Sequence, residues 1–163
     1  MRRFDLRSLS FARSDTAWRR PPVEVDPLVL GGGRCAVPDD RVDLDLTASR
    51  VGSKIVLRAA FATRLHGACA RCLEDVDLPL EARGADYVVD GESQGVEPGE
   101  EAYVRGYQLD ADRWARDLFA DALPAQLLCR EECRGLCAVC GANLNEAGEG
   151  HAHDAAAGAR REA

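Results

Sequence analysis

Alternating hydrophobic and polar positions predict an antiparallel sheet in the middle of the chain. From residue 42 onward, apolar side chains recur at every second position, the period of a strand with one buried face. We expect three strands, with a turn at residues 50–53 between the first two. Residues 85–89 are a candidate extension of the third strand beyond a break at Gly84. The apolar positions of the three runs are Val42, Leu44, Leu46 and Ala48, then Ile55, Leu57, Ala59, Phe61 and Leu65, then Val76, Leu78, Leu80 and Ala82.

A helical period replaces this alternation after residue 110. Asp110 is a predicted helix N-cap, and Pro124 is expected to end the helix. Between them, apolar side chains fall on one face at helical spacing: Trp114, Leu118, Phe119, Ala122 and Leu123. Before the helix we expect a loop at residues 90–101, which are acidic and without period, and one short strand at residues 103–109.

These elements predict an α+β fold: a small antiparallel β-sheet or partial barrel, one packed helix, and a C-terminal cysteine-rich appendix resembling a zinc knuckle. A length of 163 residues suits one main domain with an appended motif. We expect four parts along the chain. They are an N-terminal basic arm and extended segment at residues 1–38, the β body with its helix near 110–123 at residues 39–127, a Cys/His-rich metal-binding appendix at residues 128–154, and a disordered tail at residues 155–163.

The charge of the chain is unevenly distributed. The formal net charge is −7, which argues against a polyanion-binding surface over the whole molecule. Residues 1–20, however, carry six arginines against two aspartates. A basic arm ahead of an acidic body is one interpretation, and a solvated terminal segment is the other. Lys54 is the only lysine and alanine is abundant, which indicates a GC-rich coding sequence and a bacterial source.

The cysteines point to metal chemistry in a reducing compartment. No apolar run approaches the ~20 residues that span a bilayer, and no hydrophobic segment follows the first basic residues, so we expect no membrane contact and no signal peptide. The predicted location is the cytoplasm, where thiols stay reduced. The seven cysteines are therefore not expected to form disulfides, and Cys-x-x-Cys spacing favours a metal or redox role. Cys35 stands apart and is expected to be a partly buried, inert thiol.

Zinc is the predicted metal of the C-terminal cysteine-rich appendix, because C-x-x-C places two thiolates on one turn and zinc takes four such ligands. Cys137 and Cys140 form the central pair, with Gly141 suited to the turn. The other ligands are open: six residues of the appendix could contribute, Cys69 and Cys72 are an alternative pair, and either one or two metals could bind. The six appendix candidates are Cys129, Cys133, Cys137, Cys140, His151 and His153.

Two other roles compete with a structural zinc site. Cys69 and Cys72 could act as a thiol-redox pair, although such pairs are typical of a helix N-terminus rather than a connection between two strands. Alternatively, the appendix could be a zinc-dependent protein-interaction module. We find no Ser-His-Asp order, phosphate loop or dinucleotide fingerprint, so we expect neither an enzyme nor a small-molecule substrate. His66 is expected to be a polar-face strand residue.

Two motifs resemble the YceD family, the large ribosomal RNA subunit accumulation proteins. They are Cys-Ala-Arg-Cys-Leu-Glu at residues 69–74, and the run from Leu128 to Asn145 that follows a helix ending in Leu-Pro. The resemblance implies a ribosome-biogenesis factor that supports accumulation of large-subunit (23S) ribosomal RNA, with that RNA or ribosomal proteins as partners. Many members carry Cys-x-Cys after the Asn-Leu-Asn, where this chain has His151 and His153, a replacement that keeps ligand capacity.

Overall fold

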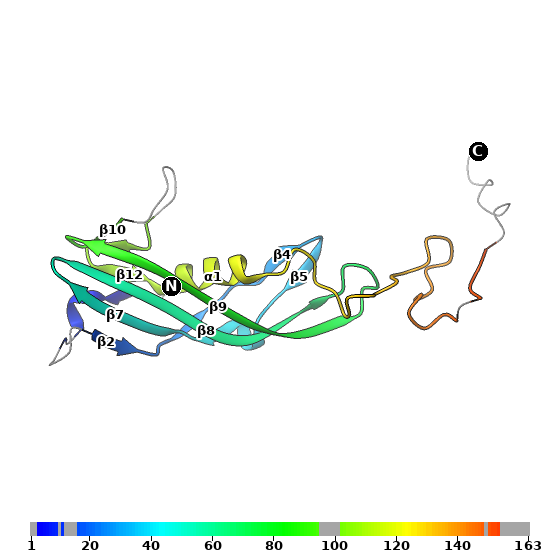
Figure 1. Cartoon of the computed structure of the whole chain (residues 1–163), viewed down its shortest axis with the longest axis horizontal. Coiled ribbons are helices and arrows are strands. Elements are labelled where there is room, and N and C mark those ends of the chain that lie inside the picture. Colours follow the sequence, from blue (N-terminus) through cyan, green and yellow to red (C-terminus); the bar gives the residue numbers. More distant parts are fainter. Residues whose placement is uncertain (1–2, 10, 12–15, 95–101, 149, 154–163) are drawn as a thin grey trace.

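A five-stranded antiparallel sheet forms the body of the protein, in a computed structural model that describes residues 3–9, 11, 16–94, 102–148 and 150–153. The strand order is β10-β9-β8-β7-β2, and the sheet lies along the long axis of the molecule (Figure 1). The strands are β2 (Thr16–Arg19), β7 (Asp45–Val51), β8 (Lys54–Ala68), β9 (Asp75–Val89) and β10 (Glu92–Ser93). The alternation expected from residue 42 onward is thus confirmed as antiparallel strands.

The hairpin of β8 and β9 is the longest element of the fold. Each strand has 15 residues, and pairing runs without interruption from Lys54 opposite Val89 to Ala68 opposite Asp75. The expected break at Gly84 is wrong, because Gly84 pairs with Ala59 inside the ladder. A Cβ at this position would lie 2.5 Å from Leu118 Cδ2, so the glycine allows the helix to pack closely on the strand.

The helix α1 (Ala111–Ala122) covers the inner face of this sheet. The Asp110 carboxylate accepts a hydrogen bond from the Arg113 backbone N–H at 3.2 Å, which confirms it as the N-cap. The predicted apolar stripe faces the core, where Trp114, Leu118 and Phe119 are buried. Leu123 is the C-cap, directly before Pro124.

The remaining strands of the described residues are short and form three small sheets. The structure has a three-stranded sheet of β1 (Arg3–Asp5), β12 (Gln108–Asp110) and β11 (Val104–Arg105), and two-stranded sheets of β3 (Pro22–Glu24) with β6 (Arg41–Asp43) and of β4 (Leu28–Leu30) with β5 (Gly33–Cys35). Short 3-10 helices span Leu6–Ser8 and Pro38–Asp40. The described strands thus form separate sheets, and the partial-barrel alternative is not confirmed.

The described part of residues 1–38 belongs to the same core. Strand β2 pairs with β7 in the main sheet, and the first 38 residues also contribute buried side chains: Leu6, Leu9, Ala17, Val23, Val25, Cys35, Ala36 and Val37. Residues 95–101 of the expected acidic loop and the expected tail at 155–163 lie outside the described residues.

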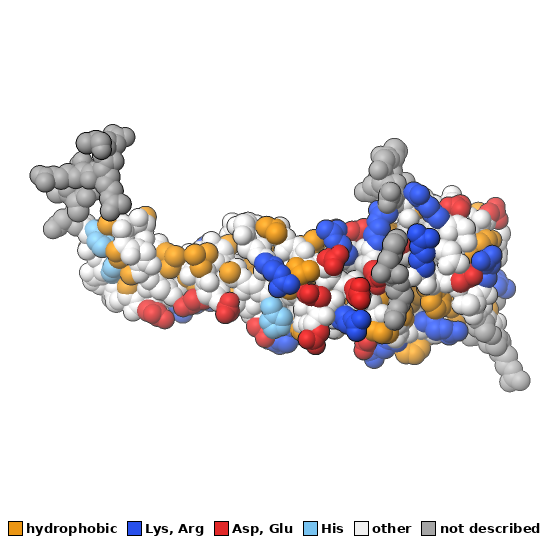
Figure 2. Space-filling model, turned by 180° about the vertical axis from the view of Figure 1, so that it is seen from behind, with side chains coloured by type: hydrophobic (Ala, Val, Ile, Leu, Met, Phe, Trp, Pro, Cys, Tyr) orange, Lys and Arg blue, Asp and Glu red, His pale blue; other side chains and the backbone are white. Residues whose placement is uncertain are grey.

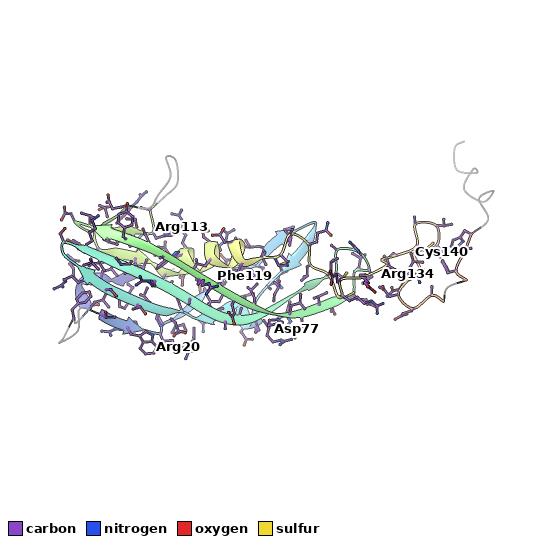
Figure 3. The ribbon with its side chains drawn as sticks, viewed as in Figure 1. Arg20, Asp77, Arg113, Phe119, Arg134 and Cys140 are labelled. Atoms are coloured by element: carbon purple, nitrogen blue, oxygen red, sulfur yellow. The ribbon has the colours of Figure 1, made fainter. Side chains whose placement is uncertain are left out.

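Beyond the helix the chain leaves the body as a narrow extension. It passes the tip of the β8–β9 hairpin and continues away from the sheet (Figure 1). Arg134 and Cys140 lie on this extension, far from Phe119 in the body (Figure 3). Figure 2 shows histidine side chains near the end of the extension, and interspersed basic and acidic side chains over the body on the same view. Among the described residues, no helix has both the length and the apolar character needed to cross a membrane.

Candidate metal centres

Four thiols from two distant segments meet at the tip of the long hairpin. Cys69 and Cys72 lie in the turn between β8 and β9, and Cys129 and Cys133 follow α1. We call these four residues the hairpin site; their sulfur atoms all lie within 4.8 Å of one another. The Cys69 Sγ is 3.7 Å from the Cys133 Sγ, and the Cys72 Sγ is 3.5 Å from the Cys129 Sγ.

A second group lies further along the extension. Cys137, Cys140, His151 and His153 form what we call the terminal site, again with all ligand atoms within 4.8 Å of one another. The Cys140 Sγ is 3.5 Å from the His151 Nε2, and the two histidine Nε2 atoms are 3.1 Å apart. Each group of four could therefore hold one metal ion.

The spacing within both groups fits tetrahedral zinc. With Zn–S bonds of about 2.3 Å, the edge of a regular tetrahedron is about 3.8 Å, and with Zn–N bonds of about 2.0–2.1 Å it is about 3.3–3.4 Å. The observed sulfur pairs at 3.5 and 3.7 Å and the nitrogen pair at 3.1 Å approach these values. All seven cysteines are free thiols, and a disulfide would need a separation of about 2.05 Å.

The two Cys-x-x-Cys turns have the same backbone hydrogen bonds. In the first, the Cys69 N–H donates to the Glu74 carbonyl at 2.8 Å, and the Leu73 N–H donates to the Cys69 carbonyl at 3.0 Å. In the second, Cys137 N–H donates to the Ala142 carbonyl and Gly141 N–H to the Cys137 carbonyl, both at 2.8 Å. The sequence offset of each bond is identical, so both sites are built on the same type of turn.

The residue after the second cysteine adopts a positive φ in both turns. Gly141 has φ 75°, which glycine adopts easily because it lacks a Cβ. Leu73 adopts φ 63° despite its branched side chain. A left-handed conformation is costly for such a residue. The turn at the hairpin tip is therefore held by its surroundings rather than by local preference.

Backbone donors stabilise the thiolate form of the first cysteine in each turn. Burial of the Cys69 thiol would raise its pKa, but the N–H groups of Cys72, Cys129 and Arg71 outweigh burial and lower the pKa to about 6. For Cys137, the Cys140 N–H is the largest cause, followed by the His151 side chain, and the pKa again falls to about 6. Hydrogen bonds that favour the charged sulfur suit a metal ligand, because metals bind thiolates.

The pKa values of the three remaining thiols of the hairpin site shift in different directions. The pKa of Cys133 is lowered, first by the Asn145 side chain. Burial raises the pKa of Cys129. The Glu74 backbone N–H lowers the pKa of Cys72, but burial and the three neighbouring thiols together raise it to about 12. Without a counter-ion, four adjacent thiols do not all ionise at neutral pH, and a bound cation would supply the missing positive charge.

Asparagines behind the sulfurs were not predicted as site residues. The Asn145 Nδ2 donates to the Cys133 Sγ at 3.3 Å, and the Asn143 Nδ2 donates to Glu74 Oε1 at 2.7 Å. Asn145 also accepts the Arg134 N–H at 2.8 Å. The sequence signal that could have identified them is the Asn-x-Asn at residues 143–145, one residue beyond Cys-x-x-Cys-Gly. These bonds link the loop of the terminal site to the hairpin site.

Arg71 and Gly135 complete the contact between the two segments. The Arg71 Nη1 donates to the Cys133 carbonyl at 2.9 Å. Gly135 has φ +74°, and a Cβ there would lie 3.1 Å from the Arg71 carbonyl. The Ala70 N–H also donates to the Leu127 carbonyl at 2.7 Å. The hairpin tip and the segment after α1 are thus bonded through the backbone as well as through the thiols.

The structure brings together all eight candidate ligands, but in two groups. Cys129 and Cys133 lie with Cys69 and Cys72, and Cys137 and Cys140 lie with the two histidines. A compact four-thiolate set from the appendix alone is not assembled. His66 is outside both groups and faces Asp77, with its Nδ1 3.8 Å from the carboxylate. Cys35 is buried in the core, where burial raises its pKa.

Comparison with known proteins identifies relatives over this region. The family model described as large ribosomal RNA subunit accumulation protein YceD matches residues 57–159. Uncharacterized proteins of Mycobacterium bovis and of two Mycobacterium tuberculosis strains are 28% identical over 116 residues, which is 69% of this chain and 56% of each relative. The chain thus spans about half the length of these curated relatives. No solved structure matches it.

Proposed function

We propose that this chain, which belongs to the YceD family of large ribosomal RNA subunit accumulation proteins, is a non-enzymatic ribosome-biogenesis factor. In this proposal it acts in the cytoplasm, where it supports the accumulation of large-subunit (23S) ribosomal RNA. Its partners would be that RNA or the proteins that assemble on it. The family match is the observation that carries the proposal, because it covers residues 57–159 and therefore both metal-site groups.

The proposed cofactor is zinc, bound once at each site. Cys69, Cys72, Cys129 and Cys133 would hold one ion, and Cys137, Cys140, His151 and His153 the other. Closed sets of four protein ligands are typical of structural zinc, whereas catalytic zinc keeps a position for water or substrate. The hairpin site joins residues more than fifty positions apart in sequence, so a metal there would staple the extension to the hairpin. This role supports a structural factor rather than an enzyme.

Thiol redox chemistry at Cys69 and Cys72 is the other candidate function. A lowered thiol pKa of about 6 at Cys69 favours it. However, the Cys69 side chain is 0% exposed, and a redox thiol must be reached by its partner. The Cys69 Sγ also lies 3.7 Å from the Cys133 Sγ of another segment, so its sulfur neighbours extend beyond the Cys-x-x-Cys pair. We therefore favour the metal role.

The test of the proposed function is a ribosome profile from cells that lack the gene. Sucrose-gradient sedimentation and the ratio of large- to small-subunit RNA are measured in the deletion strain and in a strain complemented with the intact chain. We expect a reduced amount of large-subunit RNA and particles, restored by the complementing chain. An unchanged profile in the deletion strain would refute the function.

A further inference from the structure

The outer face of the main sheet is a surface to which the metal sites give no role. We define this outer face as the outward side of β2, β7, β8 and β9, opposite the side that α1 covers. On β8 its members are the even-numbered residues, and on β9 the odd-numbered ones, all of them exposed or half-buried. The face carries side chains that the core and the metal sites do not use.

Two aromatic residues lie exposed on this face. Trp18 on β2 is 56% exposed and Tyr87 on β9 is 41% exposed, although the protein has few aromatic side chains, 6% of its residues. The register places Trp18 opposite Thr47, Thr47 opposite Arg58, and Arg58 opposite Ala85. An arginine therefore lies between the two aromatics, since Tyr87 is two residues beyond Ala85 on the same face. Exposed rings on a sheet are the usual platform for stacking bases.

Unpaired cations accompany these rings. Arg58 and Arg83 make no ion pair or hydrogen bond with any residue that the structure describes. The Lys54 Nζ lies 5.5 Å from the centre of the Tyr87 ring. Two acidic residues share this part of the face with Arg58, Arg83 and Lys54. Asp45 is already paired, with its Oδ1 3.4 Å from the Arg20 Nε, and Glu81 lies two residues before Arg83 on β9. This end of the face is thus locally basic on a chain of net charge −7.

A trough separates the two arginines. Its volume is ≈ 480 Å³, and Arg58, Arg83, Thr47 and Asp45 surround a floor of small residues. The floor exists because the outward residues here are alanines, Ala60 and Ala85, on neighbouring strands. An apolar floor with guanidinium groups at its margin suits a planar base or sugar, with phosphates placed at the arginines.

From these observations we infer that the outer face of β2, β7, β8 and β9 binds single-stranded RNA. Trp18 and Tyr87 stack bases, and Arg58, Arg83 and Lys54 contact the phosphates. This inference deepens the proposed function and rests on it for the identity of the RNA, which would be a single-stranded region of the large-subunit transcript. Acidic peptide is the other occupant with complementary charge, but charge alone leaves the two exposed aromatics without a role.

The test uses the full zinc-loaded chain and a fluorescein-labelled single-stranded RNA of mixed sequence, about 12 nucleotides long, within the range that such surfaces bind. Fluorescence anisotropy is followed as a function of salt. Trp18→Ala should weaken binding about tenfold, the loss expected for one stacked base, whereas Trp18→Phe should retain most of it. The double variant Arg58→Gln and Arg83→Gln should lower the slope of log affinity against log salt by about 1.4, because each single-strand phosphate contact contributes about 0.7.

Arg105→Gln on β11 is the matched control, since Arg105 is an exposed arginine on a different sheet. Its affinity for the RNA should equal that of the unaltered chain. Ala60→Glu, which places a carboxylate on the trough floor, should abolish binding. All variants lie at exposed positions, and their thermal unfolding is measured alongside to show that they fold.

Three results would overturn the inference: no RNA binding by the intact chain at low salt, equal losses in Arg105→Gln and the double variant, or displacement of the RNA by polyglutamate at equal charge concentration. The ribosome profile of the deletion strain distinguishes a failure of this inference from a failure of the proposed function. A loss of large-subunit RNA in the deletion strain without RNA binding in vitro refutes the surface alone. RNA binding with an unchanged profile refutes the function alone.

Discussion

The amide of Asn145 donates to the sulfur of Cys133 at 3.3 Å, although Asn145 lies in the loop of the terminal site and Cys133 belongs to the hairpin site. This bond favours the thiolate and is the first cause of the lowered pKa of Cys133. Groups behind a metal ligand fix its orientation and its charge. The Asn145 side chain therefore couples the two sites at a ligand sulfur.

Asn145→Ala should weaken metal binding at the hairpin site while leaving both sites assembled. The loss of a partner behind a ligand typically costs about 10–100-fold in metal affinity. The measurement is a zinc competition titration against a chromophoric chelator. Glu131→Gln, an exposed change in the same segment, is the control and should leave the affinity unchanged. Equal affinities in Asn145→Ala and the intact chain would show that the bond to Cys133 does not support the site.

Zinc binding at the hairpin site should release protons, in a number set by its four thiols. The raised pKa values of Cys72, about 12, and of Cys129 keep both protonated at pH 7, whereas Cys69, with a pKa of about 6, is mostly ionised. Zinc takes thiolates, so binding should release at least two protons at pH 7, and affinity should rise with pH. Below pH 6, Cys69 also binds a proton and the release should increase.

Calorimetry in buffers of different ionisation enthalpy measures this release. The variant Cys137→Ser with Cys140→Ser isolates the hairpin site by disabling the terminal one. A release near zero at pH 7 would mean that all four sulfurs are ionised before the metal binds, in conflict with the burial and mutual proximity of the thiols.

Removing the metal should loosen the hairpin tip without unfolding the body. The Ala70 N–H is bonded to the Leu127 carbonyl at 2.7 Å, a contact that the hairpin site holds in place. We expect Cys129→Ser to speed hydrogen exchange at Ala70 strongly, with little effect in the middle of β8. His151→Ala is the control, because it should speed exchange at Gly141 but not at Ala70. Unchanged protection of the Ala70 N–H in Cys129→Ser would show that the hairpin site is not needed to hold the hairpin tip against the segment after α1.

The helix cap makes a separate contribution to stability. Asp110→Ala removes the acceptor of the Arg113 N–H and should lower the free energy of unfolding by about 1 kcal/mol. Asp121→Ala, at the C-terminal end of α1, should have no such cost, because a carboxylate there opposes the helix dipole. Urea unfolding of both variants checks this. If Asp110→Ala and Asp121→Ala have the same free energy of unfolding, the Asp110 cap does not stabilise the helix.

Local patterns predicted the elements well, because a two-residue or helical period reports directly on which face is buried. Strands β7, β8 and β9 and the helix with its Asp110 cap follow from such patterns. Gly84 misled the prediction, because its role depends on Leu118 in the helix above it. Strand β2 was missed, since Thr16–Arg19 is an edge strand with one buried residue, Ala17, and too short to show alternation.

The ligand types at the metal sites could be read from the sequence, but their pairing could not. Cys-x-x-Cys spacing identifies a turn that presents two thiolates, and it says nothing about which other pair completes the site. That choice depends on the length of the β8–β9 hairpin, which carries Cys69 and Cys72 to the segment after α1. Hydrogen bonds such as that from Asn145 to Cys133 depend on the same tertiary arrangement.

X-ray absorption at the zinc edge, with metal analysis of the anaerobically purified full chain, tests the two-site assignment most directly. One site of four sulfurs and one of two sulfurs and two nitrogens predict two zinc ions per chain. The average ion would then have three sulfur neighbours at about 2.3 Å and one nitrogen at about 2.0–2.1 Å. A single zinc ion per chain surrounded by sulfur alone, or no zinc at all, would contradict the assignment.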